Sequence, residues 1–161
     1  MATTDLTKIA SQIRRDIVRM VHAQQSGHPG GSLGKKLYLR VLDISSVNEK
    51  PKVLANTSIK DVIIEITEKM LGVTAVIEQD KIIGIITDGD LRRMLSQVDD
   101  FSGLTAKDIM SANPKRIETE AMAIDALEVM ETNEISQLLV EENGTYAGVV
   151  HLHDLIKEGI I

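Results

Sequence analysis

Apolar positions along the chain form one helical stripe, followed by two similar series of helices and strands. Between Leu6 and Val21 the apolar residues recur at spacings of three and four, which predicts an amphipathic N-terminal helix. A Gly- and Pro-rich segment, residues 28–34, then predicts a loop or linker. Further along, the same helical spacing predicts helices at residues 59–71 and 123–133.

Strands are predicted after each of these two later helices. The β-branched runs VTAVI and KIIGIIT occupy the first half, and QLLVE and TYAGVVH occupy the second. The polar pairs Gln79-Asp80 and Asn143-Gly144 separate the runs and predict hairpin turns, although the spacing leaves the turn type open. The expected fold class is therefore mixed α/β, of the α+β kind.

The second half of the chain repeats the first. Gly84 and Gly148 differ in number by 64, as do Asp90 and Asp154. This divides the chain into an N-terminal helix and linker at residues 1–34, a first repeat at 35–103 and a second at 104–161. One short sheet with one helical layer buries too little apolar surface to be stable alone, so we expect the two repeats to pack as a pseudo-twofold pair.

The repeated pattern resembles a known family. A D-I-(M) start, a helix-strand-strand-helix body and a G-h-h-T-x-x-D segment resemble the cystathionine-β-synthase (CBS) domain, a tandem pair of which is called a Bateman module. This resemblance covers about residues 40–161. GIITDGDLRR, VVHLHDLIKEG and HPGGSLGKKLYLRV further resemble the C-terminal half of bacterial arabinose-5-phosphate isomerases. In that family a catalytic sugar isomerase (SIS) domain precedes the pair, and we expect it to be missing here.

The N-terminal segment resembles a different family. LTKIASQIRRDIVRMVHAQQSGHPGGSLG is similar to the first helix and loop of transketolases, where the histidine at the position of His28 would line a thiamine diphosphate site. Those enzymes anchor the cofactor's magnesium through G-D-G, and the nearest string here is Asp88-Gly89-Asp90. We therefore interpret His28 as a loop histidine, and a transketolase fragment as an alternative function.

The segment Thr87-Asp88-Gly89-Asp90 is the first candidate binding site. Thr-x-x-Asp before an apolar run fits a capping box, in which hydroxyl and carboxylate bind free backbone N–H groups. A helix N-terminus after a strand also favours anions. The resemblance to nucleotide-binding CBS domains implies that Thr87 contacts phosphate and Asp90 contacts ribose, while Arg92 and Arg93 supply positive charge.

The second repeat carries a variant of this segment. His151 stands where the first repeat has threonine, and Asp154 keeps the aspartate. A histidine can bind phosphate, but it is not expected to cap a helix as threonine does. His151, His153 and one carboxylate are the only candidate metal ligands in this segment, and the sequence pattern indicates no distant further ligand. A metal site is therefore not expected.

Composition narrows the remaining function classes. The chain has no cysteine, a net charge of −6, one Phe and two Tyr, which argues against thiol chemistry and nucleic-acid binding. With no catalytic motif, signal peptide or membrane span expected, we predict a cytoplasmic non-enzyme. The expected function is regulatory binding of an adenine or cytidine nucleotide, or of the nucleotide sugar CMP-Kdo that the resemblance implies. The other alternative is an oligomerisation module without ligand, and in either case we expect a homodimer or higher oligomer through the helices at 59–71 and 123–133.

Overall fold

The computed structural model of the protein describes residues 38–160. The helix predicted at residues 6–21 and the linker at 28–34 lie outside the described residues. Contacts divide the chain into one unit at residues 1–38 and a second at residues 39–161, and the second contains all the elements considered below.

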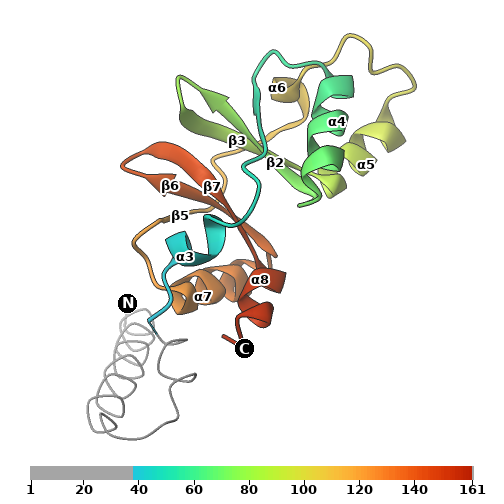
Figure 1. The fold of residues 1–161 in the computed structure, drawn as a ribbon. Coiled ribbons are helices and arrows are strands. Elements are labelled where there is room, and N and C mark those ends of the chain that lie inside the picture. The colour runs from blue at the N-terminus through green and yellow to red at the C-terminus, as the bar shows by residue number, and fades with distance from the viewer. Residues whose placement is uncertain (1–37, 161) are drawn as a thin grey trace, which may run out of the picture. The chain divides into compact units, whose positions relative to one another are not determined.

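The described chain runs through the same series of elements twice (Figure 1). The first series is α3 (Val41–Ser45), β1 (Lys52–Leu54), α4 (Ile59–Lys69), β2 (Val73–Glu78), β3 (Lys81–Thr87) and α5 (Asp88–Gln97). The second is α6 (Ala106–Ile109), β4 (Ser111–Ala112), β5 (Arg116–Glu118), α7 (Ala123–Asn133), β6 (Gln137–Glu142), β7 (Thr145–His151) and α8 (Leu152–Lys157). The predicted α+β fold class is confirmed.

Each series builds one sheet, and β4 of the second series joins the sheet of the first. One sheet has the order β1-β2-β3-β4 and the other the order β5-β6-β7; in both, the first pair is parallel and the second antiparallel. The hairpins turn through Gln79-Asp80 and Asn143-Gly144, and all four residues have positive φ between 50° and 80°. Two central residues with positive φ are typical of a type I′ turn, which settles the turn type that the sequence left open.

The two long helices form where the apolar spacing predicts them. Ser58 caps α4 by accepting a hydrogen bond from the Asp61 N–H, and α4 ends at Lys69, before the C-cap residue Met70, whose φ of 57° is left-handed. The observed helix α4 is thus two residues shorter than the helix predicted at 59–71, whereas α7 has the predicted bounds. Both helices bury one stripe against a sheet, as amphipathic helices do; its members are Ile59, Val62, Ile66, Ala123, Ala126, Leu127 and Met130.

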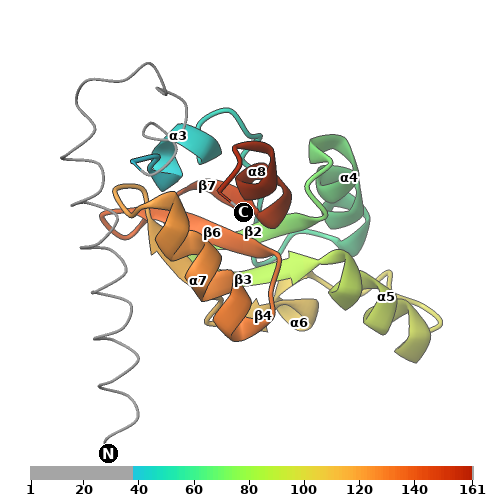
Figure 2. The same cartoon turned by 90° about the horizontal axis from the view of Figure 1, so that it is seen from below.

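A short helix from each repeat packs on the other repeat (Figures 1 and 2). In α3, the N–H groups of Val41 and Leu42 donate to carbonyls just before α7, over 2.9 and 3.0 Å. In α6, those of Ala106 and Lys107 donate to the equivalent carbonyls before α4, over 2.8 and 2.9 Å. Val41 and Ile44 therefore belong to the second core, and Ala106 to the first.

The sheets also pack directly on each other. Six buried apolar residues form a third core between them: Val73, Ala75, Ile77, Ile82, Leu139 and Val149. Strand β2 is buried along nearly its whole length because helices cover one face and the second sheet covers the other. Tyr146 adds polar links, donating its N–H to the Asp80 carbonyl over 2.9 Å and its hydroxyl to the Pro51 carbonyl over 2.8 Å. Burial raises the pKa of the Tyr146 hydroxyl.

Removing residues 1–34 should leave the melting temperature nearly unchanged, whereas removing α3 as well should lower it. The reason is that Val41 and Ile44 are 0% and 3% exposed within the second core. Burying two such side chains contributes roughly 3–6 kcal/mol, so a chain beginning at Val47 should melt at least ~10 °C below one beginning at Lys35. Circular dichroism melting measures both.

Point variants in the full chain provide the matched control. Ile44→Ala should destabilise by about 2–5 kcal/mol, whereas Leu42→Ala, at a position 41% exposed in the same helix, should cost far less. Equal melting temperatures for the two variants would contradict a packing role for α3.

Candidate functional site

The first candidate site lies where β3 passes into α5. Thr87 ends the strand in an extended conformation and caps the helix. The backbone N–H and the hydroxyl of Thr87 both donate to Asp90 Oδ2 over 2.8 Å, and the Asp90 N–H donates back to the hydroxyl over 3.3 Å. This is the capping box that the Thr-x-x-Asp spacing predicts.

Asp90 is a buried carboxylate with donors on both oxygens. Its side chain is 7% exposed, and Arg93 donates from Nη1 to Oδ1 over 2.9 Å. The Ser111 hydroxyl lies 3.5 Å from the same oxygen. Because a buried charge is costly without partners, this set of donors explains how the carboxylate is held at the end of the strand.

The other predicted residues of the first site take different positions. Asp88 is exposed, and its Oδ2 would lie only 3.1 Å from a Cβ on Gly72, where φ is +65°. Glycine at position 72 therefore leaves room for this carboxylate. Arg92 is also exposed and makes no ion pair with any residue in the described range. The structure thus brings Thr87, Asp90 and Arg93 into contact and leaves Asp88 and Arg92 beside them.

The second candidate site lies at the equivalent passage from β7 into α8. The backbone N–H of His151 donates to Asp154 Oδ2 over 3.0 Å. Asn48 donates from Nδ2 to the same oxygen over 2.8 Å and to the Val149 carbonyl over 3.2 Å. No hydrogen bond from residues 38–160 reaches Oδ1 of Asp154, so this oxygen remains an available acceptor.

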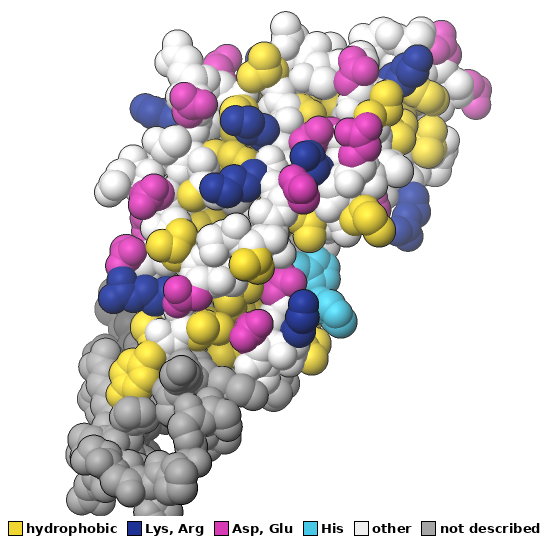
Figure 3. All heavy atoms as spheres, viewed as in Figure 1, with side chains coloured by type: hydrophobic (Ala, Val, Ile, Leu, Met, Phe, Trp, Pro, Cys, Tyr) yellow, Lys and Arg dark blue, Asp and Glu magenta, His cyan; other side chains and the backbone are white. Residues whose placement is uncertain are grey.

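One expectation about this site was wrong. His151 does act as the N-cap, because its Nδ1 accepts a hydrogen bond from the His153 N–H over 2.9 Å. An imidazole nitrogen has an in-plane lone pair, so it replaces the threonine oxygen as acceptor. The proton of the neutral ring must then be on Nε2, which becomes a donor. Figure 3 shows the histidines of the described chain as one surface patch.

Two residues of these sites, Ser111 and Asn48, were not found from the sequence. Each comes from the segment that follows a crossing helix: Ser111 follows α6 and Asn48 follows α3. Gly84 makes room for the segment that carries Ser111, whereas Gly148 is set apart by its backbone φ of +152°. A Cβ on Gly84 would lie 2.4 Å from Met110 Sδ, and one on Gly148 would lie 3.7 Å from Lys50 Cγ. Each site is therefore built from both repeats.

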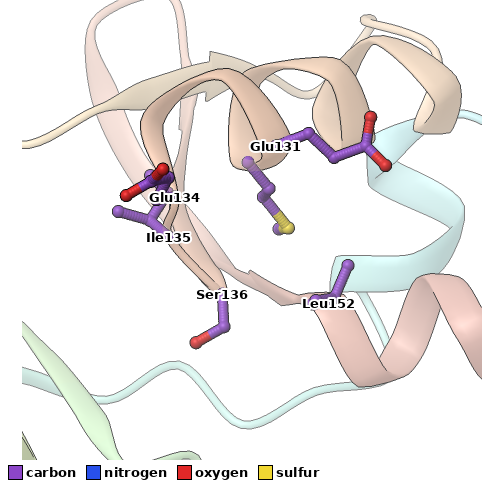
Figure 4. A pocket seen from close by; sticks show the side chains of 6 residues that line it. Glu131, Glu134, Ile135, Ser136 and Leu152 are labelled. Carbon is purple, nitrogen blue, oxygen red and sulfur yellow. The ribbon is translucent and has the colours of Figure 1, made fainter.

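A hollow of about 310 Å³ lies beside the second site (Figure 4). Its lining residues come from the end of α7, the start of β6 and the start of α8: Met130, Glu131, Glu134, Ile135, Ser136 and Leu152. None of them was predicted as a site residue. Glu131 and Glu134, which line this hollow beside apolar side chains, repel phosphate. The hollow therefore does not fit a nucleotide phosphate.

In the described part of the chain, no group of three or more His, Asp or Glu side chains could hold a metal ion. The chemistry that the two junctions offer is hydrogen bonding: a buried carboxylate accepts, and arginine, serine, asparagine and histidine donate. Such an arrangement suits recognition of a polar ligand that carries hydroxyl groups.

The His151 imidazole should titrate below the ordinary histidine pKa of 6.5, because burial, and to a smaller extent His153, lower its pKa against the opposing effect of Asp154. Between its folded pKa and 6.5, the native state binds fewer protons than the unfolded state. The free energy of unfolding should therefore fall as the pH falls through this window. NMR titration of the imidazole measures the pKa directly.

Urea unfolding of wild type and His151→Gln, from about pH 8 to about pH 5, isolates this contribution. Wild type should lose stability relative to the variant as the pH falls below 6.5. A difference that stays constant with pH would contradict the lowered pKa.

Curated relatives match the chain over most of its length. It is 40% identical to arabinose 5-phosphate isomerase KdsD of Yersinia pestis over 136 residues, which cover 83% of this chain and 42% of the relative. KdsD of Escherichia coli K12 is 38% identical over the same length and shares. The chain therefore spans less than half the length of these relatives.

Solved structures show the same fold. CBS domain protein PAE2072 from Pyrobaculum aerophilum, complexed with AMP, superposes with a TM-score of 0.66 at 18% identity, covering 76% of this chain and all of that one. The CBS domain of a bacterial CNNM/CorC family Mg²⁺ transporter, in complex with ATP, has a TM-score of 0.64 at 19% identity and covers 80% and 92%. A family model described as the CBS domain matches residues 42–97 and 106–160. The chain belongs to the CBS domain family and contains two copies of that domain.

Proposed function

We propose that this chain is a regulatory CBS pair that binds a nucleotide or nucleotide sugar, and that it serves an arabinose-5-phosphate isomerase activity as its sensor. The observation that carries the proposal is the buried Asp90 carboxylate, held where β3 meets α5 and approached by a segment of the other repeat. The relatives named KdsD and the solved CBS structures with AMP and ATP support it.

In the first site, ribose hydroxyls would donate to Asp90. The phosphate would lie at the N-terminus of α5, a ten-residue helix whose dipole attracts anions. Thr87 would contact this phosphate. Arg92 and Arg93 would supply the positive charge that attracts it, because the nearby Asp88 and Asp90 are negative.

In the second site, the free Oδ1 of Asp154 would accept a ligand hydroxyl, and Nε2–H of His151 would donate to the ligand. Asn48 holds the other oxygen of Asp154 in place. Because the carboxylate of this site accepts from a neutral amide, whereas that of the first accepts from an arginine, the two sites need not bind the same group.

We propose that the ligand is an adenine or cytidine nucleotide, or CMP-Kdo. We also propose that no residue of this chain is catalytic. Nucleic acid and membrane are not among the proposed partners, and the proposed location is the cytoplasm. Among residues 38–160, no helix has the length and apolar character that crossing a membrane requires.

Exposed apolar side chains on the helices support self-association. Ile64 on α4 and Ile124 on α7 are each 43% exposed, and Met70 at the end of α4 is 87% exposed. Exposed apolar side chains favour burial against a second copy. These residues also favour the alternative of an assembly module without ligand, which the ligand experiment decides.

Adding AMP, CMP or CMP-Kdo should raise the melting temperature of the full chain. A ligand that binds the native state at about a hundredfold excess over its Kd stabilises it by roughly 2.7 kcal/mol. Asp90→Asn should remove the shift that arises at the first site, and Asp154→Asn the shift at the second, because the amide presents donors where the ligand hydroxyls need acceptors. Differential scanning fluorimetry measures the shift.

Thr87→Ser is the matched control, because it keeps the hydroxyl that both the cap and the phosphate contact use. It should retain most of the shift. If no ligand shifts the melting temperature, or the shift survives Asp90→Asn combined with Asp154→Asn, the sensing function is refuted and the assembly module remains.

The wild-type chain should be at least a dimer in multi-angle light scattering, and Ile64→Lys combined with Ile124→Lys should dissociate it. A lysine at each position places a charge where the proposed interface is apolar. Val47→Lys is the control, since Val47 is 83% exposed but lies outside the helices. A monomeric wild type, or dissociation by Val47→Lys alone, would contradict the proposed interface.

A further inference from the structure

Both oxygens of Asp90 already accept hydrogen bonds, and Oδ1 also lies 3.5 Å from the Ser111 hydroxyl. Oδ2 accepts from the N–H and the hydroxyl of Thr87, each over 2.8 Å, and Oδ1 accepts from Arg93 over 2.9 Å. The side chain is 7% exposed, so solvent offers it little space for further donors. A ligand hydroxyl that reaches Oδ1 therefore competes there with Arg93 and with the more distant Ser111 hydroxyl.

Arg93 is the donor that can leave. The Thr87 N–H belongs to the backbone and its hydroxyl to the helix cap, so both are fixed by the fold. The guanidinium of Arg93 is 64% exposed and lies at the end of a flexible side chain. Exposed ion pairs are weak because water solvates the released cation, so among the three hydrogen bonds of Asp90 shorter than 3.0 Å the one from Arg93 is the most easily exchanged.

The second site offers an internal comparison. There the donor to the carboxylate from outside the capping box is Asn48, an amide that binds Oδ2 and the Val149 carbonyl together. Oδ1 of Asp154 accepts no hydrogen bond from the described residues, and no cation pairs with this carboxylate within residues 38–160. A ligand hydroxyl could therefore reach Asp154 without displacing a charged group.

We propose that Arg93 is a ligand-displaced latch that makes the first site select nucleotides over nucleosides. This inference rests on the proposed nucleotide-binding function. Ribose hydroxyls are neutral donors, so a nucleoside that replaces Arg93 leaves the charge of Asp90 without its cation. A nucleotide brings a phosphate, with which the released guanidinium pairs in turn. The nucleotide therefore compensates for the ion pair that binding breaks, and the nucleoside does not.

The experiment measures Kd by isothermal titration calorimetry for AMP and adenosine, and for CMP and cytidine. In every measurement the full chain also carries Asp154→Asn, so that the measured Kd belongs to the first site. Arg93→Gln should tighten nucleoside binding several-fold, because the latch is gone, and weaken nucleotide binding about tenfold, because the phosphate loses its cation. The nucleotide preference should therefore fall by more than tenfold.

Arg92→Gln is the matched control, since it removes the same charge from the neighbouring position without touching Asp90. Because Arg92 also supplies charge to the phosphate, this variant should weaken nucleotide binding, but it should not tighten nucleoside binding. Arg93→Lys keeps the charge and should restore part of the nucleotide preference. If Arg93→Gln does not tighten nucleoside binding, or if it matches Arg92→Gln in all four ligands, the latch is refuted while the proposed function stands.

A second measurement does not depend on the stability of the variants. In the wild-type chain, the Nε–H NMR signal of Arg93 should shift on adding AMP, as the guanidinium leaves Asp90 for phosphate, and the signal of Arg92 should shift less. An Arg93 signal unchanged at saturating AMP overturns the latch. If neither nucleotides nor nucleosides bind any form of the chain, the proposed function falls, and this inference falls with it.

Discussion

The exchange of short helices between the two repeats is the constraint on which the rest of the structure depends. Each repeat completes its core with a helix supplied by the other: α3 closes the second core and α6 closes the first. Equivalent pairs of backbone hydrogen bonds, all between 2.8 and 3.0 Å, fix both crossings. A single repeat has one sheet and few helices, so neither core is complete unless both repeats fold.

The crossings also assemble the candidate sites. The chain that leaves α6 pairs with β3 as strand β4 and brings Ser111 to Asp90. The chain that leaves α3 brings Asn48 to Asp154, beside β7. Glycine is required at position 84, where a Cβ would lie 2.4 Å from Met110 Sδ, and it is favoured at position 148, where φ is +152°. Packing and recognition therefore depend on the same backbone path.

Local patterns predicted most of the fold and half of each site. The repeat, both long helices and the hairpins follow from spacing, and the contacts of Thr87 with Asp90 span only three residues. Asn48 and Asp154 are 106 residues apart, and Ser111 and Asp90 are 21 apart, so no local pattern joins them. The string D-I-x-S-x-N, which starts at both Asp43 and Asp108, was the available signal. This string could be recognised as part of the sites only by knowing that α3 and α6 pack on the other repeat, which periodicity does not show.

The two sites share a backbone and differ in chemistry. In both, a strand residue caps the following helix and an aspartate three residues later binds the N–H of that cap. At the first carboxylate the side-chain donors are a hydroxyl and a guanidinium; at the second the side-chain donor is an amide, and an imidazole replaces the hydroxyl as helix cap. A charged donor must be displaced or re-paired when a ligand arrives, and a neutral one need not be. Because the backbone of each junction is already fixed by packing across the repeats, these few side chains can set different ligand preferences without changing the fold.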